Sequence, residues 1–159
     1  MLAKPGNLFL TCPIDHGESS YHNPEQLCKH FLSDQLPPEK AASFVESYLK
    51  AAERPRPDEE LSFYADHVDY FDSGRVSRKF VAQDQASYYR RWPNREFTLV
   101  GPPQLVSSNG KRATVRFHMR YQLSNARERA SGATENVVQL QQENDGFKII
   151  GIQERKVRE

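Results

Sequence analysis

The residues best suited by type to do chemistry gather between positions 64 and 72. This stretch holds the densest group of titratable side chains in the main part of the chain, namely Tyr64, Asp66, His67, Asp69, Tyr70 and Asp72. A carboxylate beside a phenol or an imidazole can exchange protons with a bound molecule, as general acid and base catalysis requires. Along an extended strand, Asp66 and Tyr70 face one way while His67 and Asp69 face the other. The pattern leaves open which set faces inward, and Tyr64, Asp66 and Tyr70 are the candidate catalytic residues.

Ionisable residues on later strands form a second group of candidates: Arg116, His118, Glu135 and Glu154. Alternation along those strands predicts that most of them lie on the outer face of a sheet.

Aromatic residues are numerous enough to line a pocket. The candidate ligand-binding residues are Tyr48, Tyr64, Tyr70, Tyr88, Trp92, Phe117 and Tyr121. A buried phenol needs a hydrogen-bond partner and can hold a polar atom of a ligand. Aromatic residues at helical spacing are more often ordinary core, and that role is the alternative for this set.

Two other clusters of residues in the sequence could bind ions. Basic residues cluster between positions 75 and 95: Arg75, Arg78, Lys79, Arg90, Arg91 and Arg95. They could hold an anionic ligand or partner, but we favour a solvated face paired with nearby acids. Zinc-type ligands lie between positions 12 and 30: Cys12, His16, His22, Cys28 and His30. Their spacing matches no zinc finger, so we predict no metal site and no cofactor.

Length and charge narrow the class of protein. A chain of 159 residues is the size of one ordinary domain. The formal charge of +1 argues against nucleic-acid binding, because no global positive field exists. No apolar run approaches the roughly 18 residues that a membrane span needs. Two cysteines are too few for a disulfide framework, which favours the cytoplasm.

The apolar spacing predicts the α+β class, with N-terminal helices packed on an antiparallel sheet. Residues 1–37 show little periodicity, so we expect a partly ordered extension before a domain over 38–159. Helices are predicted at 38–54, at 58–65 and from a cap at Ser77 to Trp92. Strands are predicted around Val68 and Tyr70 and then at 95–106, 111–124, 133–143 and 146–157.

This order of elements, together with three segments, resembles the nuclear transport factor 2-like superfamily. The segments are FYADHVDYF at 63–71, YYRRWP at 88–93 and GFKII at 146–150. The superfamily includes ketosteroid isomerases, scytalone dehydratase and polyketide cyclases, and the chain is also similar to accessory domains of larger bacterial proteins. The resemblance runs from about Ala41 to Val157. It implies a strongly curved sheet that forms a cone with a pocket, and a homodimer through the outer sheet face.

Two functions follow as the main hypotheses, and a third class is a purely structural or oligomerisation domain, which a collapsed pocket and an apolar outer sheet would support. The leading one is a noncatalytic domain that binds a small apolar or amphipathic ligand, or a partner segment, in an aromatic-lined pocket. The alternative is a lyase or isomerase that acts on a small apolar carbonyl or hydroxyl compound. An ionisable group deep in the pocket would favour the enzyme, because a binding module can be lined by rings alone.

Overall fold

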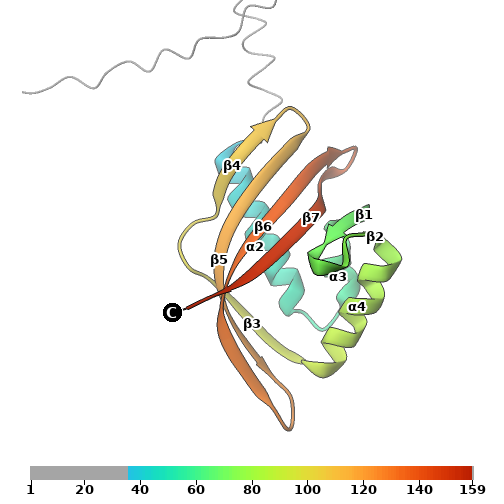
Figure 1. The fold of residues 1–159 in the computed structure, drawn as a ribbon, viewed down its shortest axis with the longest axis vertical. Coiled ribbons are helices and arrows are strands. Elements are labelled where there is room, and N and C mark those ends of the chain that lie inside the picture. The colour runs from blue at the N-terminus through green and yellow to red at the C-terminus, as the bar shows by residue number, and fades with distance from the viewer. Residues whose placement is uncertain (1–35, 159) are drawn as a thin grey trace, which may run out of the picture. The chain divides into compact units, whose positions relative to one another are not determined.

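The computed structural model of the chain describes residues 36–158. Their elements are, in chain order, α2 (Pro38–Glu53), α3 (Pro57–Leu61), β1 (Tyr64–Tyr70), the 3-10 turn η1 (Phe71–Ser73), β2 (Arg75–Ser77), α4 (Arg78–Arg91), β3 (Asn94–Leu99), β4 (Gln104–Asn109), β5 (Arg112–Ser124), β6 (Arg129–Glu143) and β7 (Gly146–Val157). Helices come first and a large sheet follows, so the predicted α+β class is confirmed (Figure 1). No helix in this part of the chain is long and apolar enough to cross a bilayer.

The seven strands form one open sheet in the order β2-β1-β7-β6-β5-β3, and β4 also pairs with β5. All pairs are antiparallel except β1 with β7. The predicted antiparallel sheet is therefore confirmed for every strand pair except this one. A parallel pair needs a long crossover connection, and the segment from α4 to β6 supplies one.

The ends of the helices follow local chemistry. Pro38 occupies the first turn of α2, where a missing N–H costs nothing, and Pro55 stops its continuation. The Ser77 hydroxyl accepts a hydrogen bond from the Phe80 N–H at 3.3 Å and caps α4, as predicted. The second helix ends at Leu61, earlier than the predicted Ala65, because the chain from Tyr64 onward is a strand that pairs with β7.

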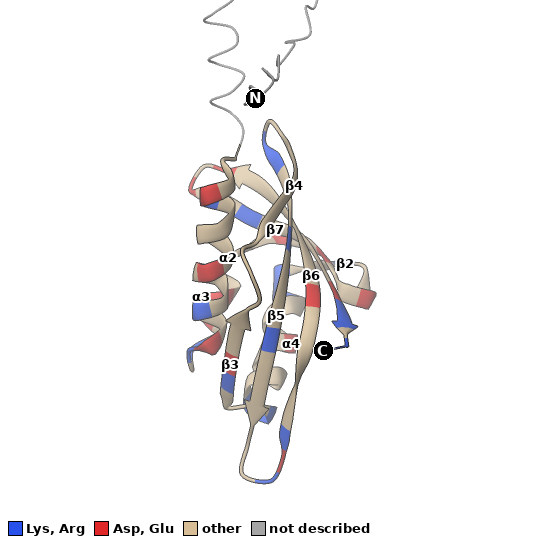
Figure 2. Ribbon diagram, turned by 90° about the vertical axis from the view of Figure 1, so that its left-hand side faces the viewer, with Lys and Arg blue, Asp and Glu red and all other residues tan. Residues whose placement is uncertain are grey.

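The core lies between the sheet and α2, which runs along one face of it (Figures 1 and 2). Val45 and Tyr48 of α2 pack in one cluster with Val115 and Phe117 of β5 and Ile149 of β7. Buried and exposed residues alternate along β5, which confirms its predicted two faces. Lys and Arg are interspersed with Asp and Glu along the described helices and strands (Figure 2).

Candidate functional site

A cavity of about 290 Å³ lies between the helices and the sheet. Side chains of α2, α3, α4, the turn η1 and strands β1, β3, β5, β6 and β7 line it: Tyr48, Leu49, Ala52, Glu60, Tyr64, Tyr70, Phe71, Asp84, Gln85, Tyr88, Phe97, Phe117, Met119, Asn136, Ile152 and Glu154. Most of these side chains are apolar or aromatic. A larger depression of about 650 Å³ beside β3 is open and polar, and most of its residues are exposed. The enclosed cavity is therefore the better candidate site.

A chain of hydrogen-bonded groups closes the inner end of the cavity. The Tyr89 hydroxyl donates to Glu60 Oε2 at 2.7 Å, and the Tyr48 hydroxyl donates to Glu60 Oε1 at 3.3 Å. The Tyr48 and Tyr64 hydroxyls lie 2.8 Å apart in a further hydrogen bond. Glu60 is only 8% exposed. Both of its oxygens are thus engaged by phenols before any ligand arrives.

Burial raises the pKa of each of three hydrogen-bonded side chains, Glu60, Tyr48 and Tyr64. It raises the pKa of Glu60, against the phenol hydrogen bonds and the nearby Arg95 charge, which lower it. Burial also raises the pKa of Tyr48 and of Tyr64 well above the usual value. These phenols therefore stay neutral at physiological pH. Each can donate or accept a hydrogen bond in the cavity wall.

Gln85 of α4 is a polar residue whose amide oxygen the fold leaves unpaired. Its side chain lines the cavity and is 4% exposed, and neither Oε1 nor Nε2 has a partner at hydrogen-bonding geometry. The amide N–H group lies near enough to the Tyr64 hydroxyl to lower the pKa of that phenol, so Oε1 is the atom with no interaction of its own. The other buried amide of the wall, Asn136, donates instead to Thr134 Oγ1 at 2.9 Å. Buried polar groups almost always have partners, so an unpaired amide oxygen inside a cavity indicates space for a polar atom of a ligand.

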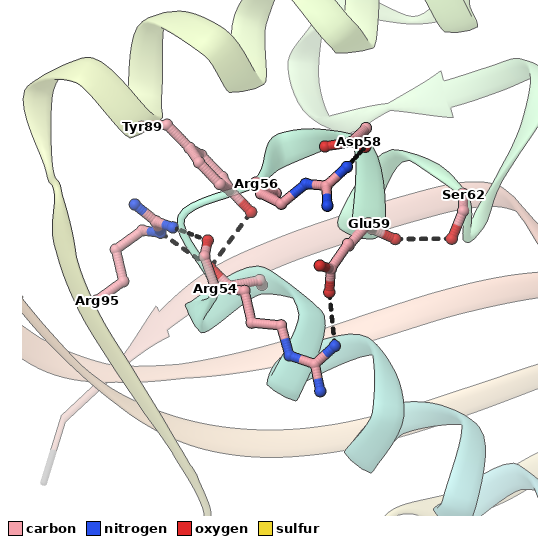
Figure 3. A network of polar contacts seen from close by, with 8 residues as sticks. Arg54, Arg56, Asp58, Glu59, Ser62, Tyr89 and Arg95 are labelled. Atoms are coloured by element: carbon pink, nitrogen blue, oxygen red, sulfur yellow. Dashed lines mark hydrogen bonds and ion pairs between the residues drawn. The ribbon is translucent and has the colours of Figure 1, made fainter.

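Arg95 holds the helices behind this wall. Its guanidinium donates to the main-chain oxygens of Ala52 at 2.8 Å, Trp92 at 2.7 Å and Arg54 at 2.6 Å. Its Cζ also lies 3.5 Å from the centre of the Tyr89 ring. Figure 3 shows Arg95 and Tyr89 converging on the end of α2. The predicted solvated role was therefore wrong for Arg95, which is buried.

The mouth of the cavity is marked by its exposed lining residues. Asp84 and Tyr88 of α4 and Glu154 of β7 are all exposed. Asp84 accepts a hydrogen bond from the Tyr70 hydroxyl at 2.9 Å. Partial burial raises the pKa of Glu154, and burial raises the pKa of Tyr88 to about 12. Acidic and aromatic groups thus surround the opening.

The structure brings together some of the residues singled out from the sequence. Tyr48, Tyr64, Tyr70, Tyr88 and Phe117 line the cavity. Two other candidates lie elsewhere. Trp92 is buried beneath Arg91, whose Cζ lies 5.0 Å from its ring, and the Tyr121 ring lies over Gly132 of β6.

Asp66 is exposed and is not among the lining residues, unlike Tyr64 and Tyr70. The cause is local geometry. The register of β1 against β7 shifts between Tyr64 and Asp69, which breaks regular alternation and turns Asp66 to solvent. His67 and Asp69 are exposed as well. The dense titratable cluster of the sequence therefore does not assemble at the cavity.

The other strand candidates divide between the two faces. On the outer face, the Glu135 carboxylate accepts hydrogen bonds from Arg155 Nε at 2.7 Å and pairs with His118 Nε2 at 2.8 Å. Arg116 is exposed too. Glu154 differs, because it lines the cavity mouth.

Sequence reasoning missed Glu60, Gln85, Asp84 and Asn136 as lining residues. A signal existed for Gln85, which lies four residues from both Val81 and Tyr89 and so interrupts the buried stripe of α4. Glu60 carried no such signal, because an acid in a helix's first turn is ordinarily explained by the helix dipole.

Metal ligands are not grouped in the described residues, where no set of three or more His, Cys, Asp and Glu side chains could hold an ion. The five cysteine and histidine residues between positions 12 and 30 lie outside residues 36–158.

Comparison with solved structures defines the fold. A proposed aromatic ring hydroxylase of Novosphingobium aromaticivorans superposes with a TM-score of 0.70 at 11% identity, over 79% of this chain and 94% of that one. A nuclear transport factor 2-like superfamily protein of Salmonella enterica gives 0.67 at 11% identity, over 77% and 92%. A proposed dehydratase of that family from Streptomyces avermitilis gives 0.66 at 15% identity, over 76% and 97%.

The chain therefore has the nuclear transport factor 2-like fold. No protein-family model matches the sequence, and no curated protein matches it.

Proposed function

We propose that the domain is a noncatalytic binding module that holds one small amphipathic molecule in the cavity. The observation that carries this proposal is the buried amide oxygen of Gln85, which accepts no hydrogen bond and belongs to a wall made largely of rings. The rings supply contact area for an apolar body, and the amide supplies one specific polar contact. The neutral phenols of Tyr48 and Tyr64 offer a second polar contact.

Size restricts the ligand. Known ligand pockets enclose roughly 300 to 1,000 Å³, and the cavity of about 290 Å³ is at the low end. A single-ring or compact two-ring compound with one or two polar atoms fits this description. A long acyl chain or a polymer segment does not.

The test uses two rings of α4 that are similarly exposed. Tyr88 is 37% exposed and lines the cavity, whereas Phe80 is 42% exposed and does not. Small aromatic alcohols and ketones are screened by ligand-observed NMR. We expect Tyr88→Ala to lower the affinity for a bound compound by about tenfold, because a lost aromatic contact costs roughly 1 kcal/mol or more. Phe80→Ala should change the affinity less than twofold. Equal effects of the two variants would contradict binding in this cavity.

A lyase or isomerase is the second candidate, and Glu60 is the observation that favours it. Its carboxyl lines the cavity and has a raised pKa, as a general acid or base often does. The phenols that occupy both of its oxygens argue for a structural role instead.

Turnover distinguishes the two functions. Compounds that bind are incubated with the protein and followed for conversion by NMR. The binding module leaves them unchanged. An enzyme using Glu60 would convert one of them, and Glu60→Gln would slow that conversion roughly 100-fold. Asp66→Asn, which changes an exposed carboxylate outside the cavity, is the matched control and should leave the rate of conversion unchanged.

A further inference from the structure

The charges around the cavity specify which kind of amphipathic molecule it holds. We infer that the ligand is an organic ammonium ion, with its apolar body against the rings and its charged nitrogen between Gln85 and the acidic mouth. This inference rests on the proposed binding function and adds the sign of the ligand's charge.

The first observation is that every side chain in the cavity wall that ionises readily is an acid. These are Glu60, Asp84 and Glu154, and none of the described lining residues is Lys, Arg or His. Positive charges do lie nearby. Arg95 is behind the wall and directs its donors at three main-chain oxygens, and Lys156 acts on Glu154 from its own strand. Burial raises the pKa of Glu60, the innermost acid, whereas Asp84 and Glu154 are the exposed acids of the wall and lie at the mouth.

The second observation is independent of these acids. The Gln85 side chain lines the cavity, and its amide oxygen is buried and accepts no hydrogen bond. An ammonium N–H is a strong donor to such an oxygen, and a charged donor makes a stronger hydrogen bond than a neutral one. Asp84 and Gln85 of α4 both line this cavity, so one ammonium group inside it can approach both side chains.

The third observation concerns the rings at the opening. Tyr88 is exposed at the mouth, and the buried Tyr70 lines the cavity beside Asp84, to which its hydroxyl donates. A cation over the face of a tyrosine ring is attracted by the ring's electrons, and aromatic walls with a carboxylate are a known way to recognise ammonium groups. An anionic ligand would meet the opposite conditions, because Asp84 and Glu154 repel it and no lining cation compensates.

The test compares three probes of similar shape. They are 2-phenylethylamine as the cation, 2-phenylethanol as the neutral analogue and phenylacetate as the anion. Affinities for the full chain are measured at neutral pH by titration with NMR detection. We expect the amine to bind at least tenfold more tightly than the alcohol, which corresponds to about 1.4 kcal/mol. Phenylacetate should not bind measurably.

Variants test whether the acids at the cavity mouth cause the preference for the amine over the alcohol. The double variant Asp84→Asn with Glu154→Gln keeps the shape but removes both charges, and it should reduce the amine-to-alcohol ratio to within about threefold. Asp69→Asn is the control, because Asp69 is exposed on β1 and does not line the cavity. It should leave the ratio unchanged, and circular dichroism verifies that each variant is folded.

The outcomes separate the two proposals. Equal or tighter binding of the alcohol would overturn the inference about charge and leave the binding function standing. A preference that survives in the double variant would overturn the role of Asp84 and Glu154. If none of the three probes binds at millimolar concentration, the proposed function itself fails and the inference fails with it.

Discussion

Replacing Arg95 by Met tests whether the cavity wall depends on one buried cation. The guanidinium makes hydrogen bonds of 2.8, 2.7 and 2.6 Å to main-chain oxygens at the ends of α2 and α4. Met has a similar length and keeps the apolar contact under Tyr89, so the change removes mainly the charge and its donors.

The magnitude follows from how each oxygen would be satisfied afterwards. A hydrogen bond to a charged group contributes roughly 1.5 to 3 kcal/mol. The Ala52 oxygen keeps only a weak second donor, because the Tyr89 hydroxyl lies 3.3 Å away and shares its single proton with Glu60 Oε2 at 2.7 Å. Arg54 is exposed, so water reaches its oxygen. The Trp92 oxygen loses its side-chain donor outright. We therefore expect the free energy of unfolding to fall by about 3 to 5 kcal/mol, the usual cost of breaking a buried charged contact.

Urea denaturation, followed by circular dichroism and by the fluorescence of Trp92, measures this loss. With a slope of about 2 kcal/mol/M the midpoint should drop by roughly 1.5 to 2.5 M. Arg91→Met is the control. Its side chain is 66% exposed and 3.8 Å from Glu128, so its replacement should cost less than about 1 kcal/mol. A loss below about 1 kcal/mol for Arg95→Met would show that water replaces all three hydrogen bonds and would refute the reasoning.

Three further outcomes are expected. Phe117→Ala should cost about 3 to 5 kcal/mol in denaturant unfolding, because Phe117 is 3% exposed in the common core; a cost under about 1 kcal/mol would mean that its contacts are dispensable. Deleting residues 1–35 should leave the melting temperature nearly unchanged, whereas Leu36→Ala should lower stability by roughly 2 kcal/mol or more, because Leu36 is 4% exposed; a large loss from the deletion alone would contradict a self-sufficient domain. Arg155 and His118 lower the pKa of Glu135 from 4.5 to about 2, so their stabilising effect is present above pH 4.5 and is lost as the pH falls toward 2. Melting temperatures from pH 6 to 2 should therefore decline less steeply in Glu135→Gln, and parallel curves would contradict this.

Helices and hairpins were predictable because their signals are local. Ser77 and Pro93 delimit α4. The turn signal Asn109-Gly110 marks the hairpin between β4 and β5, in which Asn109 pairs with Arg112 and the two residues Gly110 and Lys111 form the connection. The predicted strand over 95–106 is divided into β3 and β4, yet both lie along β5. Gly101, with φ of 75°, and Pro102 interrupt regular pairing there.

The site was less predictable because it depends on contacts between distant residues. Glu60 becomes a cavity group only when Tyr89 of α4 reaches it, 29 positions along the chain. Arg95 is buried because α2 presents free carbonyl oxygens to it, 41 and 43 positions away. The exposure of Asp66 follows from an irregular register with β7, which no pattern within β1 reveals. The homodimer through the outer sheet face stays a prediction.

The parallel pairing of β1 with β7 also sets the order in which the protein matures during synthesis. β7 supplies Ile149 to the core and both Ile152 and Glu154 to the cavity, whereas the helices and β1 leave the ribosome much earlier. Until β7 emerges, β1 has no parallel partner, and the rings of α2 and α4 lack the β7 side chains that complete the cavity wall. Domains with such distant pairings fold comparatively slowly. Nascent chains would thus expose apolar surface to chaperones until the last strand is added, and a ligand could bind only after that strand is in place.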